Sequence, residues 1–389
     1  MRFLLVVLLF CFARFLYGQT CTYLAYDGFE YSSDTPLHGL SGGTGWAAPW
    51  SVQNNNTTLP GFQSVYGNGS LSYGLLQTIG RHGTGGYQYL TAGRRLNSTD
   101  GGPFDAYIAS GTDAIGTQAG STLWYSVLLR KTSNNDQEVY TTLHSSTLDW
   151  CENCTTNKIG AGYFGTNSNV AGQRYWTLRI GDSYYPSSVP VTAGSTVFLV
   201  LSVAFNPPSG ATIQLYVNPA TLGNTTPSPT LTQTTAANLQ MRSLAFYANP
   251  VVNSGYIDEV RMGTTYRCVA PDNTVTVNLP PVAVMAATPV SGQAPLSVSL
   301  NGSTSYDPEG GTLTYLWNFN DGTGTTATTP ATSHVFPYIG RFQPSLTVTD
   351  PTGLSHTTYQ TITVLDQNGT YPCQSSLTSL QEAGCTQNN

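Results

Sequence analysis

The hydrophobic residues of this chain recur in short runs interleaved with polar residues, a pattern that predicts strands. Clear cases lie at 121–129, 139–143, 175–180, 196–204 and 211–217, each rich in Val, Leu, Tyr or Thr. Strict alternation is typical of a strand that buries one face and exposes the other. The 40 glycines and 23 prolines can supply the turns between so many strands. The pattern therefore predicts an all-β fold in which two sheets pack as a sandwich.

The first 18 residues have the composition of an export signal. Met1 and Arg2 give a short basic start, an apolar run follows at 3–12, and Gly18 is a small residue suited to cleavage. The apolar run is too short to span a bilayer. We therefore expect a secreted protein, extracellular or associated with a cell surface and not inserted in the membrane, whose mature chain begins near Gln19.

The charge content narrows the range of partners. Only 9% of the 389 residues are charged, and the formal net charge is −6. With 14 Lys and Arg in all, the chain cannot present the basic surface that binds nucleic acid or anionic lipid. We expect no nucleic-acid partner, and a surface built mainly from Thr, Ser, Asn, Gln and Gly.

Six of the seven cysteines remain once the signal is removed. An even number in an exported chain indicates disulfides. Their spacing favours three pairs: Cys21 with Cys268, Cys151 with Cys154, and Cys373 with Cys385. The first pair would close a loop of nearly the whole large domain, which in the chain-entropy model stabilises the fold by up to about 5 kcal/mol.

Composition also suggests the domain boundaries. Residues 271–279 precede Pro280-Pro281 and suit an extended linker. We expect a large domain at 19–270, a small domain at 280–365 and a short tail at 366–389 that is closed by Cys373 and Cys385.

The small domain resembles a PKD domain, an immunoglobulin-like β-sandwich. The matching stretches are Pro280–Ala283, Gly292–Leu300, Ser303–Gly310, Tyr315–Gly322, His334–Phe336 and Leu346–Asp350. On this resemblance Trp317 and Phe319 fill the core, Asp321-Gly322 makes a turn, and His334 is packed structure. Asn320 stands where the family usually has Gly, and Asn also tolerates a left-handed backbone.

The large domain resembles, at its two ends, the concanavalin A-like or LamG-like jelly rolls of exported proteins. The start is similar at Tyr26–Tyr31 and Leu40–Trp50, and the end at Tyr256–Tyr266. The resemblance implies a two-sheet jelly roll over 23–268. Between the two ends, the similarity to these jelly rolls is limited to short runs of residues that are typical of strands.

The sequence does not predict an active site. Related jelly-roll glycoside hydrolases need two carboxylates that flank the scissile bond, and none of the six Glu falls in the usual Glu-x-Asp-x-x-Glu pattern. Asp258 and Glu259 are expected to pair with Arg261 or neighbouring backbone. The Cys151–Cys154 loop lacks the second pair that zinc requires and the βαβ setting of a redox motif. We therefore expect a protein that is not an enzyme and has no catalytic residues.

Calcium is the one candidate metal, and no cofactor is required. Some PKD domains bind calcium through a loop that corresponds here to 307–310, and the resemblance implies Asn278, Asp307 and Glu309 as ligands. Oxygen donors of this kind suit Ca²⁺. The alternative is a solvated turn, and Glu309 departs from the family, where Asp is usual.

Sugar binding requires exposed aromatic rings that can stack on a pyranose. Trp150 beside the Cys151–Cys154 loop, and Tyr184 and Tyr185 in a polar turn, are the candidates. A packing role for the same rings remains the alternative.

Two functions of different class follow. One is a non-catalytic carbohydrate-binding or adhesion protein, in which the jelly roll binds an extracellular glycan and the PKD domain acts as a spacer. The other is a structural component whose two sandwiches bind surface proteins. A glycoside hydrolase-like enzyme ranks a distant third.

Overall fold

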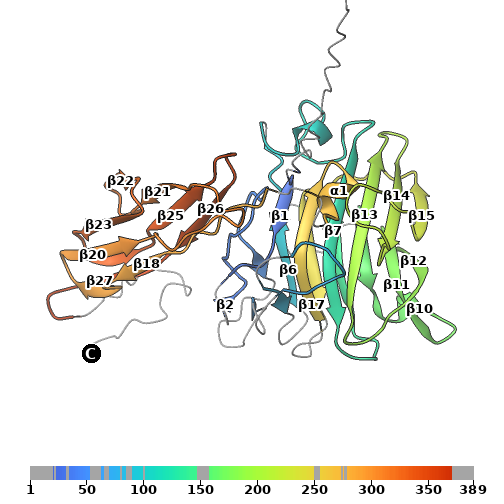
Figure 1. Ribbon diagram of the computed structural model, residues 1–389, viewed down its shortest axis with the longest axis horizontal. Coiled ribbons are helices and arrows are strands. Elements are labelled where there is room, and N and C mark those ends of the chain that lie inside the picture. The colour runs from blue at the N-terminus through green and yellow to red at the C-terminus, as the bar shows by residue number, and fades with distance from the viewer. Residues whose placement is uncertain are drawn as a thin grey trace, which may run out of the picture.

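The computed structural model describes residues 21, 23–31, 35–52, 63–64, 70–78, 81–84, 90–99, 101–146, 157–248, 255–272, 275 and 278–369. The expected signal, Trp150, the Cys151–Cys154 pair and the Cys373–Cys385 tail lie outside these residues. Two β-sandwiches follow one another along the chain, a large one and a small one (Figure 1). The prediction of an all-β fold is confirmed, as a jelly-roll sandwich followed by an immunoglobulin-like one.

The first layer of the jelly roll is a sheet of nine strands among the described residues. Its order is β15-β14-β13-β7-β17-β5-β4-β2, and β1 also pairs with β17. The strands are β1 (Ala25–Asp27), β2 (Thr35–Pro36), β4 (Gln63–Ser64), β5 (Gly83–Thr84), β7 (Thr122–Lys131), β13 (Thr196–Phe205), β14 (Ala211–Val217), β15 (Leu231–Thr235) and β17 (Gly255–Gly263).

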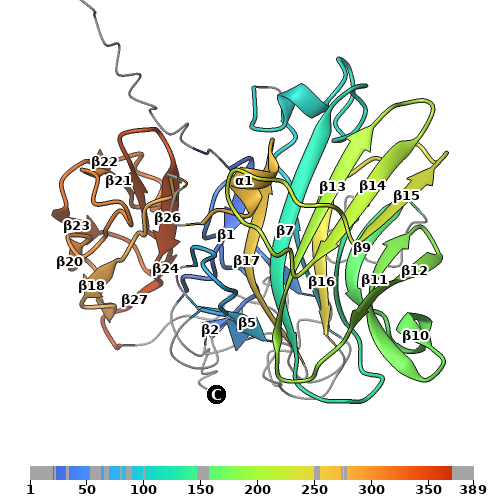
Figure 2. The same cartoon turned by 45° about the vertical axis from the view of Figure 1, so that its right-hand side comes forward.

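The second layer has eight strands in the described part of the chain (Figure 2). Its order is β10-β11-β9-β8-β16-β6-β3, and β12 also pairs with β11. The strands are β3 (Ser51–Val52), β6 (Leu90–Arg95), β8 (Val139–His144), β9 (Lys158–Tyr163), β10 (Asn169–Val170), β11 (Gln173–Ile180), β12 (Ser183–Pro190) and β16 (Ser243–Ala248).

Helical structure is confined to short turns in the described segments. They are η1 (Asp105–Tyr107), η2 (Gly165–Ser168) and α1 (Tyr266–Val269). A search of the same segments finds no helix with the length and apolarity needed to cross a membrane.

The apolar run at 196–204 is explained by burial on both faces of β13. Val197, Leu199 and Leu201 point into the core between the two sheets. Phe198 and Val200 point the other way, into a smaller cluster with α1 and its neighbours. Since neither face of β13 meets solvent, the strand does not need a polar face.

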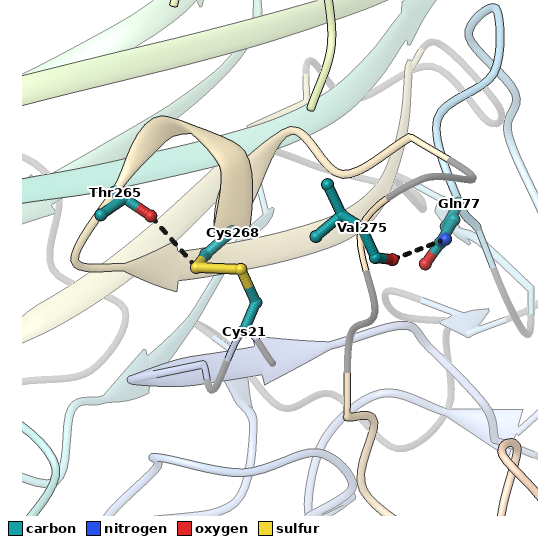
Figure 3. Close-up of a disulfide and its surroundings, with 5 residues drawn as sticks. All are labelled: Cys21, Gln77, Thr265, Cys268 and Val275. Carbon is teal, nitrogen blue, oxygen red and sulfur yellow. Dashed lines mark hydrogen bonds between the residues drawn. A yellow bond between two sulfur atoms is a disulfide. The ribbon is translucent and has the colours of Figure 1, made fainter. Parts of the chain in front are cut away.

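A disulfide joins Cys21 to Cys268, across 247 residues of sequence, as predicted (Figure 3). It ties the segment before β1 to α1, and the Thr265 hydroxyl lies 3.1 Å from the Cys268 sulfur. Both cysteines belong to a buried cluster that includes Val275 and Leu279 from the segment expected to be the linker. Val275 and Leu279 of that segment are therefore packed beside the disulfide of the jelly roll.

The small sandwich consists of three short sheets, with strand orders β18-β20-β23, β19-β27-β24 and β22-β21-β25-β26. The strands are β18 (Ala286–Thr288), β19 (Ser291–Gln293), β20 (Leu296–Asn301), β21 (Thr314–Asn318), β22 (Thr326–Ala327), β23 (Ala331–Phe336), β24 (Gly340–Phe342), β25 (Ser345–Thr349), β26 (Ser355–Tyr359) and β27 (Ile362–Leu365).

The core of the small domain matches the expectation from its motifs. Trp317 is fully buried and Phe319 nearly so, and the Trp317 indole N–H donates to the Thr329 carbonyl at 2.8 Å. His334 stacks on Phe319 with ring centroids 3.9 Å apart, and its Nε2 lies 2.6 Å from the Asp321 carboxylate. A packing role for His334 is therefore confirmed.

Asp258 and Glu259 also have the structural role that the sequence predicts. Asp258 accepts hydrogen bonds from the Ser70 hydroxyl and the Leu71 amide at 2.5 and 2.6 Å. Glu259 pairs with Arg261 at 2.5 Å. Both carboxylates are fully buried, and β17 carries a register shift between Asp258 and Arg261 that the sequence pattern did not reveal.

We predict that Trp317→Ala unfolds the small domain and leaves the jelly roll folded. The substitution removes a buried ring at a cost of about 3–5 kcal/mol, comparable to the whole stability of a small domain. The two domains have separate hydrophobic cores, so the jelly roll keeps its own. Limited proteolysis followed by mass spectrometry should yield an intact jelly-roll fragment.

Tyr338→Ala is the matched control, because this ring of the same domain is 67% exposed. The control should resist proteolysis like the unaltered chain. Simultaneous digestion of both domains in the Trp317 variant would contradict the prediction.

Candidate functional site

The eight-stranded sheet presents its second face, here called the outer face, away from the core. In β8, Val139 and Leu143 belong to the core, so the alternating Tyr140, Thr142 and His144 point to the outer face. Polar side chains on this face are nevertheless almost completely buried. They are Thr142, His144, Lys158, Thr177, Arg179 and Ser243. So many buried polar groups on one sheet face are uncommon, because each must be hydrogen-bonded or lose free energy.

Four aromatic rings form a continuous line on the outer face, here called the aromatic row. Tyr247 stacks on Tyr140, with centroids 4.9 Å apart, and Tyr140 stacks on Phe164 at 4.3 Å. Phe164 then meets Tyr184 edge to face at 5.4 Å. The inner rings are buried, and Tyr247 and Tyr184 at the two ends are half-buried. The row therefore ends in rings whose surface is partly accessible.

Two glycines of β9 make room for the aromatic row. A Cβ at Gly162 would lie 2.4 Å from the Tyr140 Cα and Cβ atoms, and one at Gly160 would lie 3.2 Å from the Phe164 ring. Gly162 and Gly160 alternate with the core residues of β9 and so belong to the outer face. The Gly-x-Gly spacing thus lets the Phe164 ring lie against the sheet.

A cation and a hydroxyl group lie beside the rings. The Arg179 guanidinium is 5.2 Å from the Tyr184 ring centroid, and its Nε donates to the Gly181 carbonyl at 2.9 Å. Thr142 and Arg179 each pair in register with Gly160, from opposite sides of β9. The buried Thr142 hydroxyl has no hydrogen-bond partner among the residues described. The outer face therefore combines ring surfaces, a cation and an unsatisfied hydroxyl group.

The structure separates the two tyrosines that the sequence proposed together. They lie in β12 and not in a turn, so they point to opposite faces of the sheet. Tyr184 joins the aromatic row, whereas Tyr185 pairs with Leu178 and packs against the core. This placement favours a packing role for Tyr185. Trp150 lies outside the described residues, so its role stays a prediction.

Sequence reasoning missed most of the aromatic row. Tyr140, Phe164 and Tyr247 lie in strands or next to one. The residues around them have the composition of an ordinary buried strand, so the sequence does not mark these rings as a separate cluster. The Gly-x-Gly of β9 and the alternation of β8 were the available signals, because together they mark a sheet face that carries large rings over small residues.

The residues proposed for calcium lie together where the chain enters the small domain. The Asn278 side-chain amide donates to the Asp350 carboxylate at 2.8 Å, and Glu309 accepts from the Leu279 amide at 3.2 Å. Asp307 accepts from the Glu309 amide at 2.7 Å. Among the described residues, however, no three His, Cys, Asp or Glu side chains converge as metal ligands would. Calcium binding at this loop stays a prediction.

Two acids with raised pKa values lie near the junction between the domains, Glu30 half-buried and Glu309 more exposed. Burial raises the pKa of Glu30 from 4.5 to about 8, and nearby Glu259 and Asp27 add to the shift. Burial likewise raises the pKa of Glu309 to about 7, with Asp307 contributing. Glu30 and His356 both line a small void between the domains, and burial lowers the pKa of His356 to about 4. Near pH 7 Glu30 and His356 therefore share the junction mainly in their uncharged forms.

The small sandwich is a PKD domain by comparison with known families, since the model described as "PKD domain" matches residues 278–365. The fold class of the large domain, a β-sandwich of jelly-roll type, is assigned from its geometry alone.

The relatives found share mainly the small domain. A microbial collagenase of Vibrio alginolyticus is 33% identical over 113 residues, which are 28% of this chain and 14% of that protein. The chain thus spans a small part of that relative. The PKD1 domain of the Vibrio cholerae metalloprotease PrtV is 36% identical over 23% of this chain and 99% of its own, with a TM-score of 0.19.

A distantly similar solved structure covers about two thirds of the chain. Domain 4 of AbnA, an extracellular arabinanase of Geobacillus stearothermophilus, was solved with arabinotriose. It is 14% identical over 65% of this chain and 98% of its own, with a TM-score of 0.33.

We predict that stability falls as the pH rises from about 6.5 to about 8, because below pH 6.5 the lowered pKa of His356 gives a slope of opposite sign. Because the folded-state pKa of Glu30 lies above its unfolded value, the folded chain holds a proton that the unfolded chain has already lost. The contribution is fully present below pH 4.5 and disappears as the pH passes 8, with a slope of up to about 1.4 kcal/mol per pH unit. Thermal unfolding at a series of pH values measures it.

Glu30→Gln should remove most of this pH dependence, because the amide stays neutral throughout and only Glu309, with a pKa of about 7, still contributes a slope of the same sign. Asp105→Asn alters an exposed carboxylate and should leave the slope unchanged. A Glu30→Gln variant with the same slope as the unaltered chain would show that Glu30 is ionised in the folded protein.

Proposed function

We propose that this is a secreted, non-catalytic carbohydrate-binding or adhesion protein whose jelly roll, of the concanavalin A-like or LamG-like kind, binds an extracellular glycan. The observation that supports this most is the aromatic row with Arg179 and the unpartnered Thr142 hydroxyl beside it. The PKD domain then acts as a spacer that holds the jelly roll away from a surface.

The outer face has the components that sugar recognition needs. The C–H groups of a pyranose stack on aromatic rings, and its hydroxyl groups need fixed donors and acceptors at the ring edge. Tyr184 and Tyr247 supply partly accessible rings at either end of the row, and Arg179 and Thr142 supply polar groups between them. The rigid sheet fixes all of these groups in place, which lowers the entropy cost of binding.

The non-catalytic part of the proposal rests on the acids. Glycoside hydrolysis requires a positioned acid and a second carboxylate within about 10 Å of each other. Asp258 and Glu259 are buried in structural contacts away from solvent, and Asp307 and Glu309 accept backbone hydrogen bonds in the PKD loop. Purified protein should therefore release no reducing sugar from polysaccharides.

The second candidate function is a structural component that binds surface proteins. Exposed apolar side chains on the PKD domain favour it, since such residues serve protein contacts. They include Val290, Leu316, Val335 and Ile339. This alternative predicts retention on a protein surface that is unaffected by changes to the outer face.

We predict that Tyr184→Ala combined with Tyr247→Ala lowers retention on a glycan column at least tenfold. Each ring contributes on the order of 1 kcal/mol, so the two together account for a factor of this size. The melting temperature should change little, because both rings are half-buried at the ends of the row. Affinity electrophoresis in gels that contain candidate polysaccharides measures the retention.

Tyr185→Ala is the matched control, because it removes the neighbouring ring of the same strand from the opposite face. It should lower the melting temperature and leave glycan retention intact. If the double variant binds as tightly as the unaltered chain, the aromatic row is a second packing cluster and the proposed site is misplaced.

A further inference from the structure

We propose that the PKD domain carries a second glycan site, which takes an acidic sugar residue and is independent of the outer face. A pocket of about 520 Å³ opens at one end of the small sandwich. The described residues that line it are Asn320, Arg341, Gln343, Tyr359 and Thr361. They come from the segment after β21, from β24 and its end, from the last residue of β26 and from the turn between β26 and β27.

The pocket has the chemical composition of a sugar site. Tyr359 is 53% exposed, so its ring can stack on a pyranose. Asn320, Gln343 and Thr361 are exposed as well and offer amide and hydroxyl groups to sugar hydroxyls. The volume falls within the range of small-molecule sites.

The pocket is held open by hydrogen bonds between its walls. The Asn320 side-chain amide donates to the Gln343 carbonyl at 2.7 Å, which ties the segment after β21 to the end of β24. The Gln360 amide donates to the Pro344 carbonyl at 3.2 Å, which ties the turn after β26 to the same segment. Asn320 has a left-handed backbone with φ of 52° and still contributes this side-chain contact. The shape therefore exists before a ligand arrives.

The charge of the pocket selects the class of sugar. The cation among its described lining residues is Arg341, whose guanidinium has five N–H donors and can therefore bind more than one partner. A guanidinium binds a carboxylate with two parallel hydrogen bonds, which neutral sugars cannot accept in the same way. A uronic acid residue stacked on Tyr359 would place its carboxylate against this group.

The pocket also adjoins a second hollow. Tyr359 and its neighbours line a cavity of about 340 Å³ between the two domains, together with Tyr31 and Gly42 of the jelly roll. A ligand of several sugar units can therefore continue past Tyr359 toward the jelly roll. We infer that the site takes an oligosaccharide stretch of an acidic polymer.

The test uses the full chain with Tyr184→Ala and Tyr247→Ala, so that the outer face does not contribute. Trigalacturonate is titrated by ligand-observed NMR, with galactotriose as the neutral counterpart. We expect trigalacturonate to bind, Tyr359→Ala to weaken it about fivefold, and Arg341→Gln to weaken it about tenfold. Galactotriose should bind about tenfold more weakly than trigalacturonate and be insensitive to Arg341→Gln.

Tyr338→Ala is the control, because this ring is exposed on the same domain and does not line the pocket. It should leave the affinity unchanged. Absence of trigalacturonate binding, equal affinity for the neutral sugar, or no effect of both the Tyr359 and Arg341 substitutions would each overturn the proposal. None of these results bears on the outer face, whose own test uses the unaltered PKD domain.

Discussion

The jelly roll depends most on the hydrogen bonds and the ion pair that the buried Asp27 carboxylate makes. This carboxylate accepts hydrogen bonds from the Arg94 guanidinium at 2.7 Å, the Trp50 indole at 2.8 Å, the Tyr31 hydroxyl at 2.7 Å and the Phe29 amide at 2.9 Å. Asp27 belongs to the nine-stranded sheet and Arg94 to the eight-stranded one. One carboxylate therefore joins both layers and the loop between them.

The buried ion pair between Asp27 and Arg94 determines the arrangement of the fold more than it adds to its stability. Removing two charges from water costs several kcal/mol each, and the attraction between them repays this only when every donor is satisfied. Arg94 meets the condition, since it also donates to the carbonyls of Gly42 and Ala48 at 2.6 and 3.1 Å. Because Arg94 must point inward, the alternation of β6 is fixed, and so is that of β16 beside it. Tyr247 is thereby assigned to the outer face.

Much of this fold follows from sequence patterns, and the outer face shows where they fail. Trp317 and the Cys21–Cys268 pair were predictable, because a motif or a spacing admits few alternatives. Tyr184 and Tyr185 were expected to share one site, because Gly, Asp, Pro and Ser around them suggest a turn. Pairing with β11 instead makes the segment a strand, and a strand sends neighbouring side chains to opposite faces. The turn of this hairpin lies at 181–182, just before the two tyrosines, and the polar composition around them does not show which residues form it.

The junction determines how the proposed glycan sites act together. Asn278 bonds to Asp350 of the PKD domain, while Leu279 and Val275 pack beside the disulfide of the jelly roll. Val275, Asn278 and Leu279 of the connection are therefore held by contacts with the two domains. When two weak sites are held at a fixed spacing, binding at one raises the effective concentration at the other, provided the ligand can span both. A long polysaccharide meets that condition and a short oligosaccharide does not. The two proposed sites together would thus favour retention on polymeric surfaces, with each site alone weak enough to release.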